Sequence, residues 1–150
     1  MTLVAISGVK NEIDVIEAFV RHTLAFADRL IVLDNGSTDG TRDVLRALSG
    51  EGLPLDLVED PSLGYYQARR MNYLLREHAL GRYGADWILP LDADEFVAVS
   101  EGCSLVPEGV APARPLSLSW RTYFPDKSDD ASQPNPVLRI RHRRRQEGWG

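Results

Sequence analysis

Two aspartates that follow an apolar run are the residues of this sequence best suited to chemistry. Asp92 and Asp94 come directly after Trp87–Leu91, a run that is typical of a buried strand. Residues two apart in an extended segment point to the same side, so the two carboxylates repel each other unless a cation lies between them. A hard divalent cation, which prefers oxygen ligands, is the natural candidate. The pair therefore predicts a metal site at the end of this strand.

Two further polar clusters each follow a short apolar run nearer the start of the chain. The first is Lys10–Glu12 and the second is the turn-rich segment Asp34–Thr41. In open α/β sheets, ligands bind beyond the carboxyl ends of the strands. In a parallel sheet, these two clusters and Asp92–Glu95 would therefore emerge at one edge, and their convergence predicts a ligand site more strongly than any one cluster does.

Each cluster also has a purely structural interpretation. Asn11 and Glu12 suit the start of a helix, with Asn11 as its N-cap, and Thr38 or Asp39 suits the cap of the next helix. The third cluster suits the cap of a short helix after its strand. For each cluster taken alone, this alternative stays open.

The spacing of apolar residues predicts the elements that position these clusters. Short apolar runs predict four buried strands, at 3–6, 30–33, 55–58 and 87–91. Helical spacing or helix boundaries predict three helices between them: one at 11–27, one that follows the Asp34–Thr41 turn and closes at Gly50, and one at 65–80. This alternation implies an α/β fold with a parallel, doubly wound sheet. After Asp94 the pattern loosens, with a half-exposed strand expected at 116–120 and a short final strand at 137–140.

Composition limits the class of protein. A chain of 150 residues with 43% hydrophobic residues is typical of one soluble domain, and its net charge of −5 argues against a general nucleic-acid binder. The lone cysteine, Cys103, excludes an intrachain disulfide and fits a reducing compartment. There is no signal-peptide pattern and no apolar run of about 20 residues, so we expect a cytoplasmic protein without a transmembrane segment, for which peripheral membrane contact stays open.

The three clusters, in this order and spacing, resemble the family 2 glycosyltransferases. More narrowly, they resemble the family 2-like group whose metal motif reads D-A-D-E-F. The similarity runs over residues 1 to 97 and lies in Val9–Glu12, Val32–Thr41 and Leu91–Phe96. The later segments Trp120–Phe124 and Arg139–Arg143 are also similar to that group.

The resemblance implies a GT-A fold, which is a Rossmann-like, mostly parallel sheet flanked by helices. It implies inverting, metal-dependent transfer of a sugar from a nucleotide-sugar donor, here a UDP-sugar or a similar donor, to a hydroxyl of an unknown glycan, lipid or protein. The implied donor contacts are Lys10, Asn11 and Glu12 beside the base and ribose, Asp34 and Asn35 on the base, Gln67, Arg69 and Arg70 at the third helix, and Asp92 at the ribose. Asp92 and Asp94 would hold Mg²⁺ or Mn²⁺. Many relatives carry two acids where this chain has Asp34 and Asn35, so Asn35 departs from the pattern of base recognition.

The general base is not assigned by the resemblance. Asp126, Asp129 and Asp130 are candidates by residue type only, and ordinary solvated loop acids are the other interpretation. His142 is a candidate metal ligand or phosphate contact, or else part of a basic surface strand. We expect one GT-A-like domain over residues 1–150, with a nucleotide-sugar-binding half at 1–97 and a partial acceptor-side region at 98–150. Whether it is truncated at its C-terminal end stays open.

Two other functions stay open. A non-catalytic nucleotide-sugar-binding module, or an inactive fragment, would bind the donor without transferring sugar. A nucleotidyltransferase can use a similar sheet and acidic metal site. It ranks last because the N-terminal part of the chain has no glycine-rich phosphate loop with an accompanying basic residue.

Overall fold

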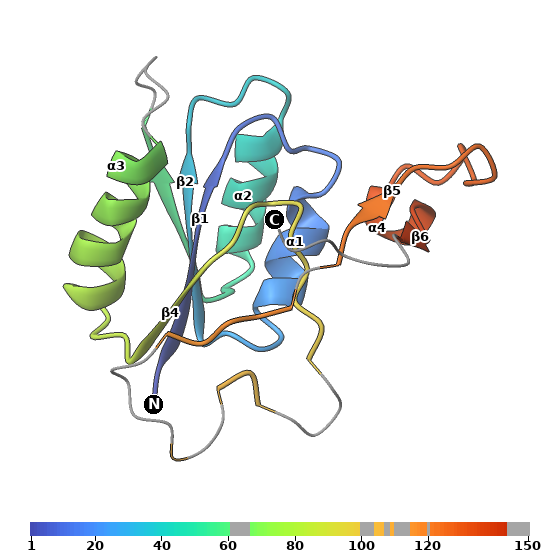
Figure 1. Cartoon of the computed structure of the whole chain (residues 1–150). Coiled ribbons are helices and arrows are strands. Elements are labelled where there is room, and N and C mark those ends of the chain that lie inside the picture. Colours follow the sequence, from blue (N-terminus) through green and yellow to red (C-terminus); the bar gives the residue numbers. More distant parts are fainter. Residues whose placement is uncertain (61–66, 100–103, 107–108, 110–114, 120, 144–150) are drawn as a thin grey trace. The chain divides into compact units, whose positions relative to one another are not determined.

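The computed structural model describes residues 1–60, 67–99, 104–106, 109, 115–119 and 121–143 (Figure 1). Contacts within the chain divide it into two compact units, residues 1–112 and 113–150, which are described separately here. Cys103, Trp120, Arg144 and Arg145 lie outside the described residues. The single domain expected over residues 1–150 stays a prediction.

A parallel sheet is the centre of the first unit. Its strands are β1 (Leu3–Val9), β2 (Arg29–Asp34), β3 (Leu55–Glu59) and β4 (Trp87–Pro90). They lie in the order β3-β2-β1-β4, and all three pairings are parallel. The predicted α/β fold with a mostly parallel sheet is therefore confirmed, and all four strands fall where the apolar runs placed them.

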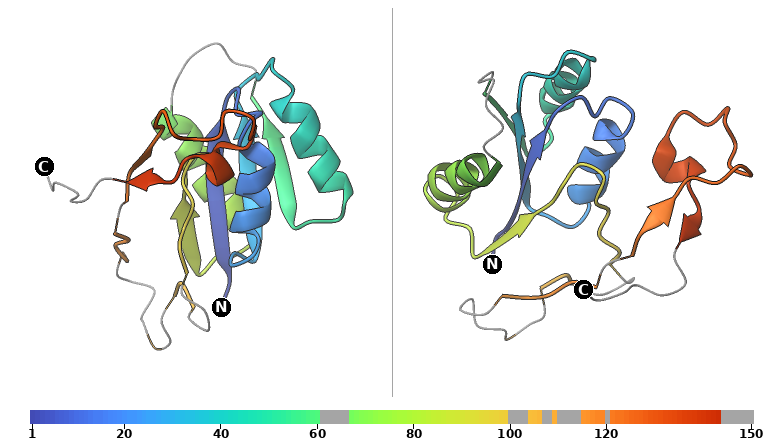
Figure 2. Two further views of the ribbon diagram at one scale, coloured as in Figure 1. Left: turned by 90° about the vertical axis from the view of Figure 1, so that its right-hand side faces the viewer. Right: turned by 45° about the horizontal axis from the view of Figure 1, so that its top comes forward.

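Helices cover both faces of this sheet (Figures 1 and 2). They are α1 (Ile16–Thr23), α2 (Thr41–Gly50), α3 (Gln67–Tyr73) and the π-helix η1 (Leu74–Leu80). Successive residues of a strand point to opposite faces, so Ala5 packs with α1 and α2 on one face, whereas Val4 and Ile6 pack with η1 on the other. None of the described helices is long and apolar enough to cross a membrane.

The third predicted helix differs from the prediction in its geometry. Residues 65 and 66 of the range 65–80 lie outside the described residues, and the helix that starts at Gln67 widens into the π-helix η1 from Leu74. Its end is closed by Gly81, whose N–H donates to the carbonyl of Arg76, five residues earlier. Apolar spacing does not distinguish the two helix types here, because the seven residues of η1 make fewer than about two turns of either, too few to define a period.

The second unit corrects two predictions. Residues 115–119 form no strand, and the pairing instead joins β5 (Tyr123–Phe124) to β6 (His142–Arg143) in antiparallel orientation. The strand expected at 137–140 was also wrong, because Pro136–Arg139 forms the short helix α4. Asn135 caps this helix by accepting a hydrogen bond from the Val137 N–H, and Pro136 occupies a first-turn position, where its missing N–H is not needed. Alternation of apolar residues predicts a face, but it does not supply a partner strand.

The close of η1 predicts a difference between two glycine substitutions. A Cβ atom at Gly81 would lie 2.9 Å from the carbonyl oxygens of both Arg76 and Glu77, whereas a Cβ at Gly50 would meet no atom within 4 Å. We expect Gly81→Ala to lower the free energy of unfolding by about 1–3 kcal/mol through overpacking. Gly50→Ala, the matched control at the end of α2, should be neutral or stabilising by up to about 1 kcal/mol. Urea denaturation measures both, and equal effects would contradict the crowding at Gly81.

Candidate functional site

The register of the sheet brings the three polar clusters to one edge. Val9 at the end of β1 pairs with Asp34 at the end of β2, and Ile6 pairs with Pro90 at the end of β4. The clusters that follow these strands therefore leave the sheet at the same end, as the sequence predicted. Because β1 lies between β2 and β4, its cluster at residues 10–12 neighbours both of the others.

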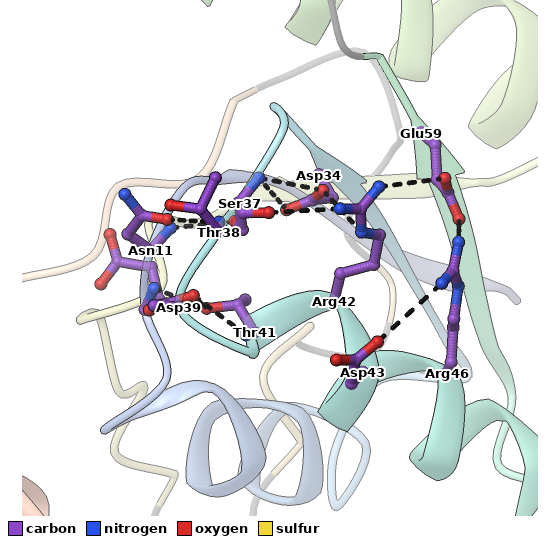
Figure 3. Close-up of polar contacts among 11 residues, drawn as sticks. Asn11, Asp34, Ser37, Thr38, Asp39, Thr41, Arg42, Asp43, Arg46 and Glu59 are labelled. Atoms are coloured by element: carbon purple, nitrogen blue, oxygen red, sulfur yellow. Dashed lines mark hydrogen bonds and ion pairs between the residues drawn. The ribbon is translucent and has the colours of Figure 1, made fainter.

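Backbone and side-chain hydrogen bonds tie the loop after β1 to the loop after β2 (Figure 3). The Asn11 N–H donates to Ser37 Oγ at 2.9 Å, and Asn11 Oδ1 accepts from the Thr38 N–H at 2.9 Å. The Glu12 N–H donates to Thr41 Oγ1 at 2.8 Å. Asn11 adopts the left-handed conformation, with φ of 58°, which asparagine tolerates better than most residues. These bonds hold the two loops as one rigid edge.

The expectation that Asn11 caps the first helix was wrong. The helix α1 begins only at Ile16, after a turn in which the carbonyl of Glu12 accepts from the N–H groups of Val15 and Ile16. The side chain of Asn11 bonds the neighbouring loop instead. The next helix, α2, begins at Thr41 with Asp39 beside it, since Asp39 Oδ1 accepts from both the N–H and the hydroxyl of Thr41.

Asp34 is a buried carboxylate whose charge is compensated. Its side chain is 1% exposed, and both of its oxygens accept from the Ser37 N–H at 3.2 Å. The Nε of Arg42 lies 3.9 Å from Asp34 Oδ2, and another nitrogen of the same guanidinium donates to the Ser37 carbonyl (Figure 3). The third nitrogen of Arg42 lies 3.7 Å from Glu59 at the end of β3. Arg42 thus links the loop after β2 to the end of β3.

Sequence reasoning missed Arg42 as a residue of this site. A signal was present, because Arg42 is the second residue of α2 and so lies directly after the turn-rich cluster. A cation in the first turn of a helix is unfavourable for the helix dipole, so its position there indicates a partner elsewhere. That partner is the pair Asp34 and Glu59.

Asn35 carries an unsatisfied acceptor. It is 9% exposed, its N–H donates to the Val9 carbonyl, and its Oδ1 has no hydrogen-bond partner among the described residues. A buried amide oxygen without a donor is unfavourable by roughly 1–3 kcal/mol, so a ligand N–H that reached it would recover that energy. Asn35, which is expected to contact the base, therefore has a free hydrogen-bond acceptor among the described residues.

Negative charge accumulates on the β4 side of the edge without similar compensation. Burial raises the pKa of Glu12, and the charges of Asp94, Asp14, Asp39 and Asp92 raise it further. The pKa of Glu95 is also raised, by burial first and then by Asp92 and Asp94, although the hydrogen bond that it accepts from the Asp92 N–H opposes this. Because Glu12 responds to Asp94 and Asp92, the ends of β1 and β4 lie within electrostatic reach of each other.

The acidic motif itself forms a closed turn. The Asp92 N–H donates to Glu95 Oε2, and the Glu95 N–H donates to the Asp92 carbonyl, each at 3.0 Å. A helix does not follow, so the capping interpretation of this cluster does not describe the structure. The turn leaves Asp92 and Asp94 exposed.

The three donor contacts predicted at the start of the third helix, Gln67, Arg69 and Arg70, lie in different surroundings. Gln67 lines a cavity of about 490 Å³ together with Asp92, Glu95 and the apolar Met71 and Leu91. Arg69 is exposed. Arg70 is buried, and its Nε donates to Asp60 at 2.9 Å, next to the end of β3. The cavity therefore places Gln67, but not the Arg70 guanidinium, beside the acidic motif.

The candidate bases and His142 belong to the second unit. Asp126 Oδ1 accepts from the N–H and hydroxyl of Ser128, and Asp130 Oδ1 accepts in the same way from Ser132. These bonds lower the pKa of both carboxyls below the ordinary value. Asp129 differs, since its Oδ1 lies 3.3 Å from the Nδ1 of His142 and its side chain is 7% exposed.

The residues of the acidic motif are of a kind that can hold a divalent cation together with a phosphate ligand. Among the described residues, no group of three or more His, Cys, Asp or Glu side chains is arranged to hold a metal by itself. Mg²⁺ is usually held by one or two carboxylates together with substrate phosphates, so Asp92 and Asp94 supply enough protein ligands for such a site. Burial and then the charges of Asp94, Asp14, Asp39 and Asp92 raise the pKa of Glu12, and a cation at this edge would offset those charges.

The parallel sheet with helices on both faces is the architecture of the GT-A class of glycosyltransferases, and comparison with known proteins agrees. The chain belongs to glycosyl transferase family 2, whose profile matches residues 5–149. Comparison with curated proteins found no match.

A solved structure that resembles this chain is a mannosyltransferase, PcManGT from Pyrobaculum calidifontis, in complex with GDP-Man and Mn²⁺. The two chains are 27% identical over the aligned part, with a TM-score of 0.50. The aligned part covers 61% of this chain and 27% of that protein, so the chain spans about a quarter of the length of its solved relative.

Removing the charge of Glu12 itself should increase stability in a pH-dependent way. Its pKa is raised above the ordinary value of 4.5, so the folded state binds the proton more tightly than the unfolded state. Stability is therefore lost as pH rises through the raised pKa, and ionised Glu12 destabilises the fold at neutral pH. We expect Glu12→Gln to raise the Tm at about pH 7 and to have little effect at about pH 4.

Differential scanning fluorimetry of the wild type and the variant across this range provides the measurement. Glu77→Gln, on the exposed surface of η1, is the matched control and should show no pH-dependent gain. A gain for Glu12→Gln that is the same at both pH values would contradict the electrostatic origin.

Proposed function

We propose that this chain acts in the transfer of a sugar from a nucleoside-diphosphate sugar to an acceptor hydroxyl, with a divalent cation at Asp92 and Asp94. The observation that supports this most is the accumulation of negative charge from Glu12, Asp92 and Asp94 at the carboxyl edge of a family 2 sheet. A site this acidic repels a diphosphate unless a cation lies between them. Donor and cation would therefore bind together.

The cation would supply charge stabilisation to the leaving group. Breaking the bond between sugar and phosphate releases a nucleoside diphosphate, and Mg²⁺ or Mn²⁺ bound to its phosphates offsets the negative charge that develops there. Asp94 is proposed as the principal protein ligand. Asp92 is proposed to contact both the cation and the donor ribose, because it is exposed and lines the cavity beside α3.

The loops after β1 and β2 are proposed to hold the nucleoside. Asn35 Oδ1, buried and without a donor, would accept an N–H of the base. Asp34 would hold this loop in position next to the base, because its own oxygens already accept from Ser37 and face Arg42. Lys10 and Asn11, on the loop that Ser37 and Thr38 hold in place, would lie beside the base and ribose.

The base of the donor is open to direct test. The resemblance in sequence favours a UDP-sugar, whereas the solved mannosyltransferase is in complex with GDP-Man. Both uracil and guanine carry a ring N–H that an amide oxygen accepts, so Asn35 fits either base. Gln67 and Arg69 are proposed to approach the diphosphate or the sugar from the start of α3, since Gln67 already lines the cavity with Asp92.

Transfer with inversion needs a base that removes the proton of the acceptor hydroxyl. Asp126, Asp129 and Asp130 are proposed candidates, and Asp129 differs from the other two in its contact with His142. The side chains of Asp126 and Asp130 each bind a serine of their own turn. His142 would reach a metal or phosphate only through its Nε2, because its Nδ1 faces Asp129.

Removal of the Asp94 carboxylate tests the metal assignment. The wild type is measured with UDP or GDP, each with and without Mn²⁺. A nucleotide that binds should raise the Tm only when Mn²⁺ is present. At a nucleotide concentration of about 100 times Kd, the added free energy of unfolding should be about 2.7 kcal/mol. Asp94→Asn should abolish this gain while keeping the unliganded Tm within a few degrees. Asp43→Asn on α2, whose side chain is 83% exposed, is the matched control and should keep the full gain. Undiminished, Mn²⁺-dependent stabilisation of Asp94→Asn would exclude Asp94 as the ligand.

Substitution of the candidate bases separates an enzyme from a module that only binds the donor. Asp126→Asn, Asp129→Asn and Asp130→Asn should all retain the Mn²⁺-dependent thermal shift. The variant that removes the base should lose about 10²- to 10⁴-fold in the rate of nucleoside diphosphate release from the sugar nucleotide, with an acceptor mixture present. If the wild type binds the donor but releases no nucleoside diphosphate above background, the module is the correct interpretation. Release of pyrophosphate from a nucleoside triphosphate would instead indicate a nucleotidyltransferase.

A further inference from the structure

The two units of the chain carry opposite charge. Residues 113–150 hold eight Lys and Arg against four Asp and Glu, a formal charge of +4, whereas residues 1–112 hold nine against eighteen, a charge of −9. The donor edge accounts for part of the acidic excess, but no step of the proposed transfer uses the basic excess. The second unit therefore carries a charge that the proposed function does not explain.

The second unit also exposes most of the large apolar side chains that the structure leaves uncovered. Ten such side chains are exposed among the described residues, and six of them belong to the second unit. These six are Leu116, Leu118, Tyr123, Phe124, Val137 and Leu138. Water-exposed apolar side chains beside positive charge are characteristic of surfaces that bind anionic, partly apolar partners.

The β5–β6 ribbon places both kinds of side chain together. Tyr123 and Arg143 are directly opposite each other in the antiparallel pair, so their side chains share one face of the ribbon. Arg141 precedes Arg143 by two residues, at the start of the same extended segment, and its Nε donates to the carbonyl of Leu138 at 3.3 Å. Tyr123 is 52% exposed and Leu138 is 55% exposed. Arg141, Arg143, Tyr123 and Leu138 are named here the basic–apolar surface.

The cationic groups of this surface have few internal partners. Within the part of the chain that the structure describes, no ion pair involves Arg141 or Arg143, although six other arginines take part in one. Asp129, the most buried acid among the described residues of the second unit, faces His142 instead. The positive charge of the ribbon thus remains available to an external anion.

We propose that the basic–apolar surface docks the protein on an anionic membrane surface. Arginines near a bilayer gain about 1 kcal/mol each from acidic headgroups, and aromatic and aliphatic side chains add affinity by entering the interfacial region. A nucleic acid would match the charge but has no place for Leu138 and the neighbouring aliphatic side chains, so a lipid surface matches both properties.

Vesicle sedimentation of the full chain tests this proposal. Vesicles of phosphatidylcholine alone are compared with vesicles containing about 30% phosphatidylglycerol, at about 0.05 M and about 0.5 M NaCl. We expect binding to the anionic vesicles at low salt, strong reduction at high salt, and little binding to the neutral vesicles. Arg143→Glu should weaken binding at least about tenfold, and Leu138→Ser should weaken it at both salt concentrations.

Matched variants in the first unit distinguish the surface from net charge and general hydrophobicity. Arg76→Glu changes the net charge as much as Arg143→Glu, and Leu80 is 47% exposed, so Leu80→Ser removes a comparable apolar side chain. Both control variants should bind as the wild type does. Equal loss for Arg76→Glu and Arg143→Glu, equal binding to neutral vesicles, or no sedimentation with anionic vesicles would overturn the proposal.

Competition by a single-stranded oligonucleotide, at a phosphate concentration equal to that of the lipid, tests the alternative partner. Full displacement from the vesicles would overturn the membrane assignment in favour of a general polyanion site, whereas retained binding supports it. The thermal shift with nucleotide and Mn²⁺ should be the same for Arg143→Glu and the wild type. Failure of membrane docking is therefore distinguishable from failure of the proposed transfer function.

Discussion

Repulsion between carboxylates at the end of the sheet is the interaction on which the rest of this site depends. The hydrogen bonds of β1 with β2 and β4 fix the positions of Glu12, Asp92 and Asp94, and the two packed faces of the sheet hold those strands in place. The backbone therefore forces together charges that would otherwise separate. Burial and then the nearby charges of Asp94, Asp14, Asp39 and Asp92 raise the pKa of Glu12, and a cation bound at this edge would offset that negative charge.

The two halves of the edge differ in how their carboxylate charges are compensated. On the β2 side, Asp34 is neutralised by Arg42 and bonded to Ser37, so this half is rigid before any ligand arrives. On the β4 side, charge is left uncompensated, and Asp92 stays exposed. If this edge binds a donor as proposed, the compensated β2 side would hold the base, and the acidic β4 side would accept the diphosphate only together with a cation.

The sequence predicted the elements that leave a periodic apolar pattern. It did not predict the role of a residue whose hydrogen-bond partner lies far away in the chain. Apolar runs separated by helical spacing predicted the parallel sheet and the edge where the clusters meet, because burial on both faces leaves a strong pattern. Asn11 was misassigned as a helix cap because its partners, Ser37 and Thr38, lie 26 and 27 residues away. The expected strand at 116–120 failed for a similar reason, since residues 116–119 have no partner strand among the described residues. The expected strand at 137–140 failed for a local reason, because the cap at Asn135 favours a helix there.

The position of β4 at the end of the strand order has a practical consequence for handling this protein. Among the described residues, β4 pairs only with β1, so one row of its backbone amides and carbonyls is open to intermolecular strand pairing. Pro90 lacks an N–H and limits that pairing at one end, and Trp87 is only partly buried at the other. Self-association through this edge would bring the acidic turns of two molecules close together, so solubility should improve at low ionic strength, where like charges keep molecules apart.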